Sequence, residues 1–390
     1  MQQSDRISSL LGDGNDGWGV FLKARGMIAA GTDVTELTIG EHDIRTHPDI
    51  LNFMHEAAIA GHTGYAEVPG VLALRKAVAA RVQAQTGVPT SADNVLITPG
   101  GQSALFSAHH AVCDSGDTAL YIDPYYATYP ATLRAVGAIP KTVPAHAVDN
   151  FQPRADEIAK AATGAKSLLI NSPNNPTGVV YSRATLEGIA DVCRAHDLWL
   201  ISDEVYDTQI WEGEHISPRA LPHMAERTLV VGSMSKSYAM TGSRIGWIIA
   251  PEAVIENLIT LATHTTYGVP GFIQDAALYA LERGAPLEAE IAAPFARRRQ
   301  IAMQVLAGQN VVKHVPCMGA MYLMLDIRAT GLTGEGFADA LLEAEHIATM
   351  PGESFGTSAA GHIRVAMTVE DAAFREALER LLAFAKRLAT

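Results

Sequence analysis

The sequence of 390 residues has few cysteines and no excess of positive charge. Its three cysteines, Cys113, Cys193 and Cys317, form no CxxC pair, and so sparse a set is not typical of a disulfide framework. The formal net charge is −13 at pH 7, which argues against nucleic acid or an anionic membrane as the main partner. The sparse, unpaired cysteines also lead us to expect a reducing compartment.

Long apolar runs are also absent. No run approaches the ~18 apolar residues that a transmembrane helix needs, and the N-terminal MQQSDRISSL has no apolar segment typical of a signal peptide. We therefore expect a cytoplasmic protein without a membrane partner. A GxGxxG match at residues 12–17 (GDGNDG) follows no convincing strand, so we do not interpret it as a dinucleotide site.

The middle of the chain alternates short apolar runs with helical patterns. One helical pattern begins after Ser182, which can cap it, and places apolar residues at i, i+3, i+4 and i+7. Apolar strands separated by amphipathic helices indicate an α/β protein with a mainly parallel sheet between helices. Active sites of such sheets lie at the carboxyl ends of the strands. The predicted strands are 118–122, 166–171, 198–202, 228–233 and 244–250.

The length of the chain fits one large domain and a smaller one. The N-terminal part is predicted to hold a short helix at 17–31 and a strand at 35–39. Charged helices begin near residue 281, followed by the strand MYLMLDI and a final helix after residue 369. We predict a large domain over 46–280, and a small α/β domain formed by 1–45, with an N-terminal arm, and 281–390.

Several polar residues follow the predicted strands directly. The loop NSPNNPTG (171–178) holds Asn175 beside a proline, and Asp203 ends the next run, with Tyr206 one turn later. A buried carboxylate is costly without a partner. Taken singly, the loop also fits an ordinary turn, and Asp203 also fits a helix cap.

Lys236 lies between small polar residues after another strand. Ser233, Ser235 and Arg244 surround it in sequence and could bind a phosphate, as could the helix start at Gly101 and Gln102. A lysine beside a phosphate site indicates an imine with a phosphorylated aldehyde, pyridoxal 5′-phosphate (PLP). Asp203 would then face the ring nitrogen of PLP, and Asn175 and Tyr206 its phenolate oxygen.

These segments together resemble the class I/II aminotransferases, a family of fold-type-I PLP enzymes, over nearly the whole chain. The resemblance rests on GYAEVPGVLALRKAV, TPGGQSAL, DPYYATYP, NSPNNPTG, ISDEVYD, SMSKSYAMTGSRIGW and GHIRVAM. It implies that Lys236 is the Schiff-base lysine and that Asp203 is the partner of the pyridinium nitrogen. The other cofactor-binding residues that it implies are Gly101, Gln102, Tyr126, Asn175, Tyr206, Ser233, Ser235 and Arg244.

The resemblance also implies how substrates bind. Arg364, in GHIRV, matches an arginine that holds the α-carboxylate of the substrate, with Gly40 and Asn175 beside it. Tyr65 matches a tyrosine that reaches the phosphate in the neighbouring subunit. A homodimer with shared active sites is therefore expected, and no metal site is predicted.

Some segments resemble bacterial arginine:pyruvate transaminases within this family. In the related aspartate aminotransferases, a lysine that serves the distal carboxylate stands in the place of Gln102. Gln102 therefore weakens the case for aspartate as the donor. A partner for a guanidinium is not evident from the sequence, although Asp13, Asp16 and Glu41 lie near the N-terminal arm.

The predicted function is ping-pong transamination from an L-amino acid to a 2-oxo acid such as pyruvate, through a Schiff base of Lys236. A PLP-dependent β-lyase on the same fold is the alternative, because it would use the same Lys236 and Asp203. A transcription factor that uses this fold as a ligand sensor would need a DNA-binding module. Only about 30 residues precede the region that resembles the family, so we do not expect such a module there.

Overall fold

The computed structural model describes residues 1, 3–12 and 17–389. Residues 13–16 of the GDGNDG motif, Asp13 and Asp16 among them, lie outside the described residues. None of the helices in the described part of the chain combines the length and the apolar character needed to cross a membrane.

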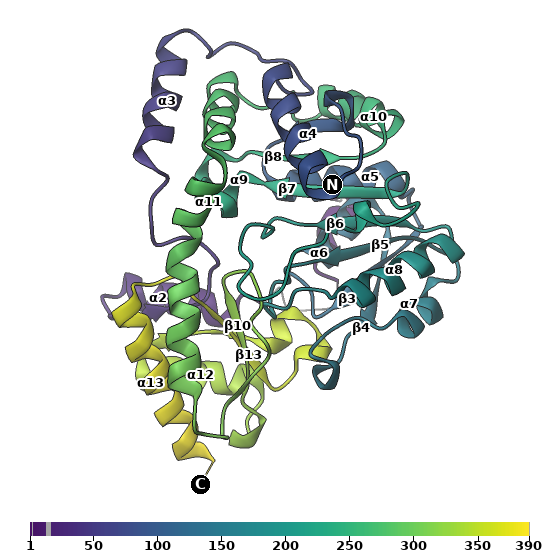
Figure 1. Ribbon diagram of the computed structural model, residues 1–390. Coiled ribbons are helices and arrows are strands. Elements are labelled where there is room, and N and C mark those ends of the chain that lie inside the picture. The colour runs from purple at the N-terminus through teal and green to yellow at the C-terminus, as the bar shows by residue number, and fades with distance from the viewer. Residues whose placement is uncertain (2, 13–16, 390) are drawn as a thin grey trace.

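A seven-stranded sheet forms the centre of the larger part of the molecule (Figure 1). All neighbouring strands are parallel, except that β8 runs antiparallel to both of its neighbours. All five predicted strands belong to this sheet, so the predicted, mainly parallel α/β architecture is confirmed. The order is β2 (Val95–Thr98), β8 (Gly246–Ile249), β7 (Thr228–Ser233), β6 (Trp199–Asp203), β5 (Ala165–Asn171), β3 (Thr118–Asp123) and β4 (Ile139–Pro144).

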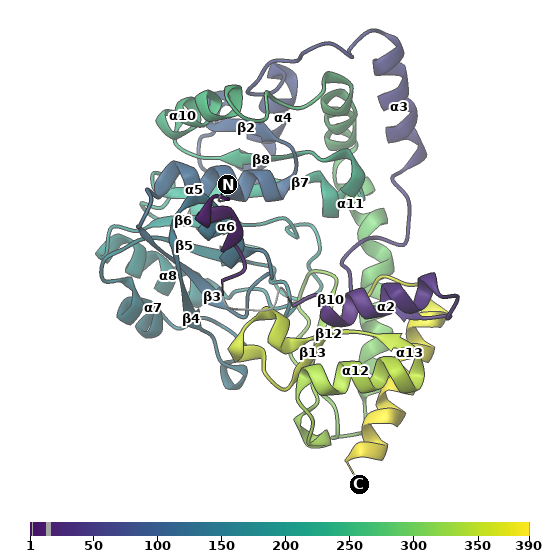
Figure 2. The ribbon, with the colours of Figure 1, turned by 180° about the vertical axis from the view of Figure 1, so that it is seen from behind.

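Helices cover both faces of this sheet (Figures 1 and 2). Side chains alternate between the faces of a strand, so Leu168 and Ile170 pack with α7 (Ala155–Ala162) and α8 (Arg183–Ala195) on one side. Leu169, between them, packs on the other side. That side is covered by α5 (Gly101–Val112), α6 (Tyr129–Val136) and α10 (Glu252–Thr263).

The helix predicted after Ser182 is α8. The Ser182 hydroxyl accepts a hydrogen bond from the Thr185 N–H at 3.1 Å, which satisfies one of the unpaired donors of the first turn. The four apolar positions predicted for its inner face are all buried: Leu186, Ile189, Ala190 and Cys193.

The two ends of the chain meet around a second, four-stranded sheet (Figure 2). Its antiparallel order is β12 (Met350–Pro351), β13 (His362–Ala366), β10 (Tyr322–Asp326) and β9 (Lys313–His314). The strand predicted at 35–39 is shorter than expected: β1 (Thr35–Glu36) pairs in parallel with β11 (Ile347–Ala348). The helices of this part are α2 (Gly19–Ala29), α12 (Gly334–Glu345) and α13 (Asp371–Leu388).

The long helix α11 (Gly271–Leu306) runs from the upper to the lower part of the molecule in Figure 1. It is kinked at Gly284, where φ is +59°. The domain boundary predicted at residues 280 and 281 falls inside α11, and the division into two domains stays a prediction. The other helices are α1 (Asp5–Ser8), α3 (Pro48–Ile59), α4 (Leu72–Thr86) and α9 (Met234–Ser237).

Candidate active site

A cavity of about 290 Å³ lies where the parallel strands end. The register pairs Asn171, the last residue of β5, with Asp203, the last residue of β6. The Asn171 amide also donates to the Asp203 carbonyl at 2.9 Å. The cavity brings together all of the predicted site residues but one: Gly40, Gly101, Gln102, Tyr126, Asn175, Asp203, Tyr206, Ser233, Ser235, Lys236, Arg244 and Arg364.

Tyr65 is the exception. It does not line this cavity, it is 91% exposed, and its ring contacts Tyr267 edge-on with a centroid distance of 5.1 Å. In its own chain, Tyr65 therefore lies on the surface, outside the cavity. A role for Tyr65 in the site of a second copy stays a prediction.

Asp203 is a buried carboxylate at the floor of the cavity. Its side chain accepts hydrogen bonds from the Tyr129 hydroxyl at 2.6 Å and from the Val205 N–H at 3.4 Å. Burial raises the pKa of Asp203 to about 6, and the hydrogen bond from Tyr129 opposes this shift. A cationic group bound next to this carboxylate would stabilise its ionised form and lower its pKa again.

Lys236 lies on the short helix α9, directly after β7. The Ser233 side chain accepts from the Ser235 N–H at 3.1 Å and so caps this helix, while the Gln209 amide donates to the Lys236 carbonyl at 3.3 Å. The Lys236 ammonium donates to the Gly40 carbonyl. Burial lowers the pKa of Lys236 to about 8; Glu41 opposes this shift, whereas Arg364 and Arg244 add to it. The amine is therefore far easier to deprotonate than an exposed lysine.

One end of the cavity is suited to an anion. Helix α5 begins at Gly101, and its first N–H groups have no partner within the helix, so they present a partial positive charge. Gly100 has φ +83°, and a Cβ atom there would lie 2.5 Å from Nη2 of Arg244. The glycine thus lets the guanidinium approach the helix start. The Ser233 and Ser235 side chains line the same cavity.

The Gln102 side chain is held from two directions. Its amide nitrogen donates to the Thr132 hydroxyl at 2.8 Å, and its oxygen accepts from the Thr128 hydroxyl at 3.0 Å. Both functional atoms are therefore engaged within the protein. If Gln102 contributes to phosphate binding, its backbone N–H at the start of α5 is the group placed to do so.

Arg364 enters the cavity from β13, in the second sheet. It donates to the Asn175 side-chain oxygen at 2.8 Å and to the Thr38 carbonyl. Its guanidinium lies 4.6 Å from the ring centroid of Tyr322 and 4.4 Å from that of Phe355. Its Nε is buried and has no hydrogen-bond partner among the described residues. The guanidinium is thus fixed in place without a carboxylate partner among the described residues.

Three residues of the site were missed by the sequence analysis. Tyr129 bonds Asp203, Tyr322 shares a 2.9 Å hydrogen bond with Tyr206, and Trp18 lines the cavity. Tyr129 follows β3, whose carboxyl end lies at the same edge of the sheet, but nothing in DPYYATYP shows which tyrosine points inward. Tyr322 and Trp18 carry no comparable signal in the sequence.

Comparison with known proteins identifies the kind of site. Residues 32–381 match the family described as aminotransferase class I and II. The chain belongs to this family. The resemblance predicted from the sequence is therefore confirmed, and the protein is an aminotransferase.

Individual relatives cover the whole chain. It is 38% identical to an arginine–pyruvate transaminase of Pseudomonas aeruginosa, over 100% of this chain and 99% of that one. It is 34% identical to an aspartate/prephenate aminotransferase of Thermus thermophilus, over 93% of each. The solved structure of an aspartate aminotransferase from Thermotoga maritima superimposes with a TM-score of 0.92 at 31% identity, covering 98% of this chain and 100% of that one. The aminotransferase fold is thus shared along the full length.

Proposed function

We propose that this aminotransferase uses PLP to move the amino group of an L-amino acid to a 2-oxo acid such as pyruvate. The observation that carries this proposal is a single cavity that holds Lys236, a buried acid and a buried arginine. Asp203 ends a strand of the large sheet, Lys236 lies on α9 directly after another strand of it, and Arg364 lies in the small sheet.

The residues present fit PLP by their chemistry. Arg244, the helix start at Gly101 and two serine hydroxyls suit the phosphate, and the buried Asp203 carboxylate suits a protonated ring nitrogen. Asn175 and Tyr206 lie in the same cavity as donors for the ring oxygen. The aromatic ring of Tyr126 also lines it, as expected of a group that stacks on the cofactor.

Bound PLP would supply a carbonyl carbon for covalent attachment and a ring that accepts electrons from the α-carbon of the substrate. The Lys236 amine is the attachment point, and once released it is the base that takes the α-proton of the donor at Nζ. Its lowered pKa increases the fraction that is neutral near pH 8. Arg364 orients the α-carboxylate of both substrates, which bind in turn to the same site in a ping-pong sequence.

We infer that the preferred donor is not a dicarboxylate. The Gln102 side chain offers no positive charge, and both of its functional atoms are engaged by threonines. The similarity to the arginine–pyruvate transaminase supports arginine or another long side chain as donor and pyruvate as acceptor. Besides Asp203, the described carboxylate that lines this cavity is Glu41, which accepts a hydrogen bond from the Thr241 hydroxyl at 2.9 Å.

We further propose a homodimer in which Tyr65 completes the site of the partner subunit. Tyr65 and Tyr267 form an exposed aromatic pair outside the cavity of their own chain. This exposed pair is the contact that we assign to the second chain.

Borohydride reduction of the PLP-loaded protein tests the assignment. The visible absorption band should disappear, and peptide mapping should find the reduced cofactor on Lys236. Label on another lysine would refute the role of Lys236. Assays with and without a 2-oxo acid then separate the two activities, because a β-lyase would release ammonia and pyruvate without an amino acceptor.

A further inference from the structure

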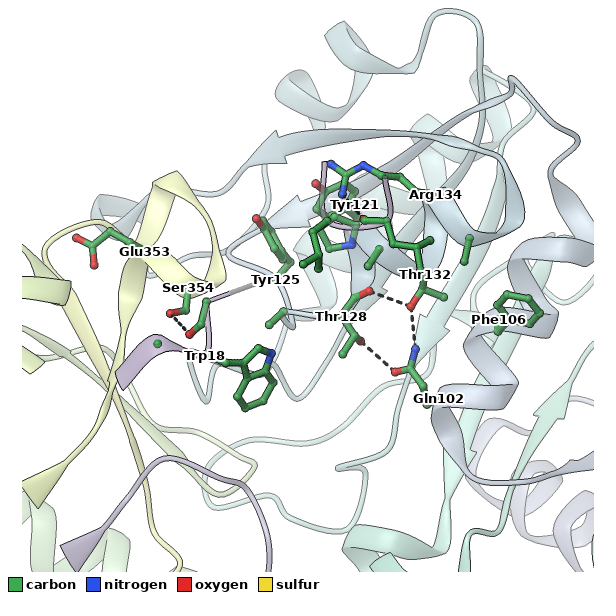
Figure 3. A pocket seen from close by; sticks show the side chains of 18 of the residues that line it. Trp18, Gln102, Phe106, Tyr121, Tyr125, Thr128, Thr132, Arg134, Glu353 and Ser354 are labelled. Atoms are coloured by element: carbon green, nitrogen blue, oxygen red, sulfur yellow. Dashed lines mark hydrogen bonds between the residues drawn. The ribbon is translucent and has the colours of Figure 1, made fainter. Parts of the chain in front are cut away.

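A second, larger chamber adjoins the active-site cavity. It has a volume of about 950 Å³, and its walls include Phe106, Tyr121 and Tyr125 (Figure 3). Trp18, Gln102 and Arg244 line both the chamber and the inner cavity. The two spaces therefore meet at these three side chains, and a substrate side chain too long for the inner cavity has room to continue outward.

Trp18 is held at this junction by its neighbours. The Ser354 hydroxyl donates to the Gly17 carbonyl at 2.8 Å, as the dashed line in Figure 3 shows. Gly17 has φ +74°, and a Cβ atom there would lie 2.8 Å from Cβ of Ser354, so a glycine is needed for this close approach. Trp18 is the N-cap residue of α2 and packs edge-on against Phe21 at a centroid distance of 5.5 Å.

Among the described charged side chains of the outer chamber, Arg134 and Glu353 bond within the fold, and Glu335 is exposed. Arg134 donates to the Leu10 carbonyl at 3.0 Å. Glu353 accepts from the Gly334 and Gly361 N–H groups at 3.0 Å each, and in Figure 3 its carboxylate points away from Trp18. The surface next to the inner cavity is thus the partly exposed indole of Trp18 beside the fixed amide of Gln102.

We propose that Trp18 is a specificity-determining residue for the side chain of the donor. This role of Trp18 rests on the proposed aminotransferase function. It favours donor amino acids with long side chains that end without a carboxylate. The side chain leaves the inner cavity between Trp18 and Gln102 and lies along the indole in the outer chamber. An apolar chain gains by covering the ring, and a guanidinium at its end gains a cation–π contact. A carboxylate gains no ion pair at this junction, because Gln102 is neutral and Arg244 serves the phosphate.

The test compares long and short donors in three variants. In the wild type, we expect kcat/KM to be higher for arginine and norleucine than for alanine. Trp18→Ala should lower the values for both long donors ~tenfold or more, while alanine changes less than about twofold. Trp18→Phe, which keeps an aromatic ring, should retain most of the preference. Leu22→Ala, on the same helix but exposed and lining neither space, is the matched control and should behave as the wild type.

A binding measurement makes the test independent of turnover. Hexanoate and propanoate carry the carboxylate for Arg364 but no amino group, so calorimetric titration reports side-chain affinity alone. Trp18→Ala should abolish most of the preference for hexanoate. Equal losses for long and short ligands, or no loss for either, would overturn the proposal. If the wild type bound hexanoate preferentially but transaminated no donor, the proposed function would fail while the role of Trp18 stood.

Discussion

Replacing Asp203 with asparagine should stabilise the cofactor-free protein and at the same time weaken cofactor binding. The carboxylate is 4% exposed, and its burial raises its pKa from 3.8 to about 6. A pKa that is higher by one corresponds to about 1.36 kcal/mol of free energy. Holding Asp203 ionised in the folded protein therefore costs roughly 3 kcal/mol once the pH exceeds both pKa values. Asparagine removes this cost and can still accept the hydrogen bond from Tyr129.

The sign of the pH dependence follows from the raised pKa. Below pH 3.8 the carboxyl is protonated in both the folded and the unfolded chain, so it imposes no cost; above pH 6 the full cost applies. The stability advantage of Asp203→Asn should therefore be largest above pH 7 and should shrink toward pH 4. For a chain of 390 residues, ~3 kcal/mol corresponds to an increase in Tm of about 2–4 °C.

Cofactor affinity should change in the opposite direction. A neutral amide cannot pair with a protonated ring nitrogen, and removing one partner of a buried ion pair costs about 3–5 kcal/mol. The Kd for PLP should then rise by roughly two to four orders of magnitude. Calorimetric unfolding of the cofactor-free protein at several pH values, together with a PLP titration, measures both effects.

The neighbouring carboxylate provides a matched control. Glu204 is also buried, but its oxygens accept from the Ser217 hydroxyl at 2.8 Å and lie 3.1 Å from Nε2 of His215, outside the cavity. Glu204→Gln should lose stability and leave the Kd for PLP within about twofold of the wild type. The reasoning fails if Asp203→Asn unfolds more readily than the wild type at pH 8, or if it binds PLP with unchanged affinity.

Three further predictions concern Arg364, Lys236 and the subunit arrangement. Arg364→Ala should raise KM for every donor about 10- to 100-fold, because losing a charge-assisted contact costs roughly 1.5–3 kcal/mol; PLP should stay bound by absorbance, and an unchanged KM would contradict the role. In the cofactor-free protein, labelling of Lys236 by an amine-reactive reagent should increase through pH 8, since burial lowers its pKa to about 8; a midpoint near 10.5 would show that the shift is absent. Mixing Tyr65→Phe with Lys236→Ala should restore activity above either parent, because shared sites leave one site without a lesion, and a fully active monomer would argue against sharing.

Much of the site could be predicted because a parallel sheet collects strand ends at one edge. Asn171, Asp203 and Ser233 end three adjacent strands, and short local spacing then places Asn175 and Lys236 close by. Tyr129, Tyr322 and Trp18 could not be predicted in this way. Packing between segments far apart in the sequence decides which tyrosine after β3 contacts Asp203. The same kind of packing brings Trp18 from the N-terminal part into the site.

The engagement of Gln102 illustrates the same limit. The start of α5 was predictable from its glycines, and so was a position near a phosphate site. The packing of α6 against α5 brings Thr128 and Thr132 to the Gln102 side chain. No sequence pattern within either helix predicts this packing.

Among the described residues, three charged side chains without an oppositely charged partner lie together in one cavity of this aminotransferase, whereas Arg219 and Asp123, also buried and without an ion pair, lie outside it. Arg298 is 3% exposed and is fully paired, with Asp43 at 2.6 Å and Asp371 at 3.0 Å. Arg364 is equally buried, yet its partners in the described chain are a carbonyl, an amide oxygen and two aromatic faces. Lys236 is partly buried and Asp203 is buried, and the pKa values of both are displaced toward their neutral forms. Charges left in this condition cost stability, and all three lie in one cavity. A ligand with a carboxylate at one end and a cationic ring nitrogen at the other recovers that cost, so the fold should become markedly more stable when its cofactor and substrate bind.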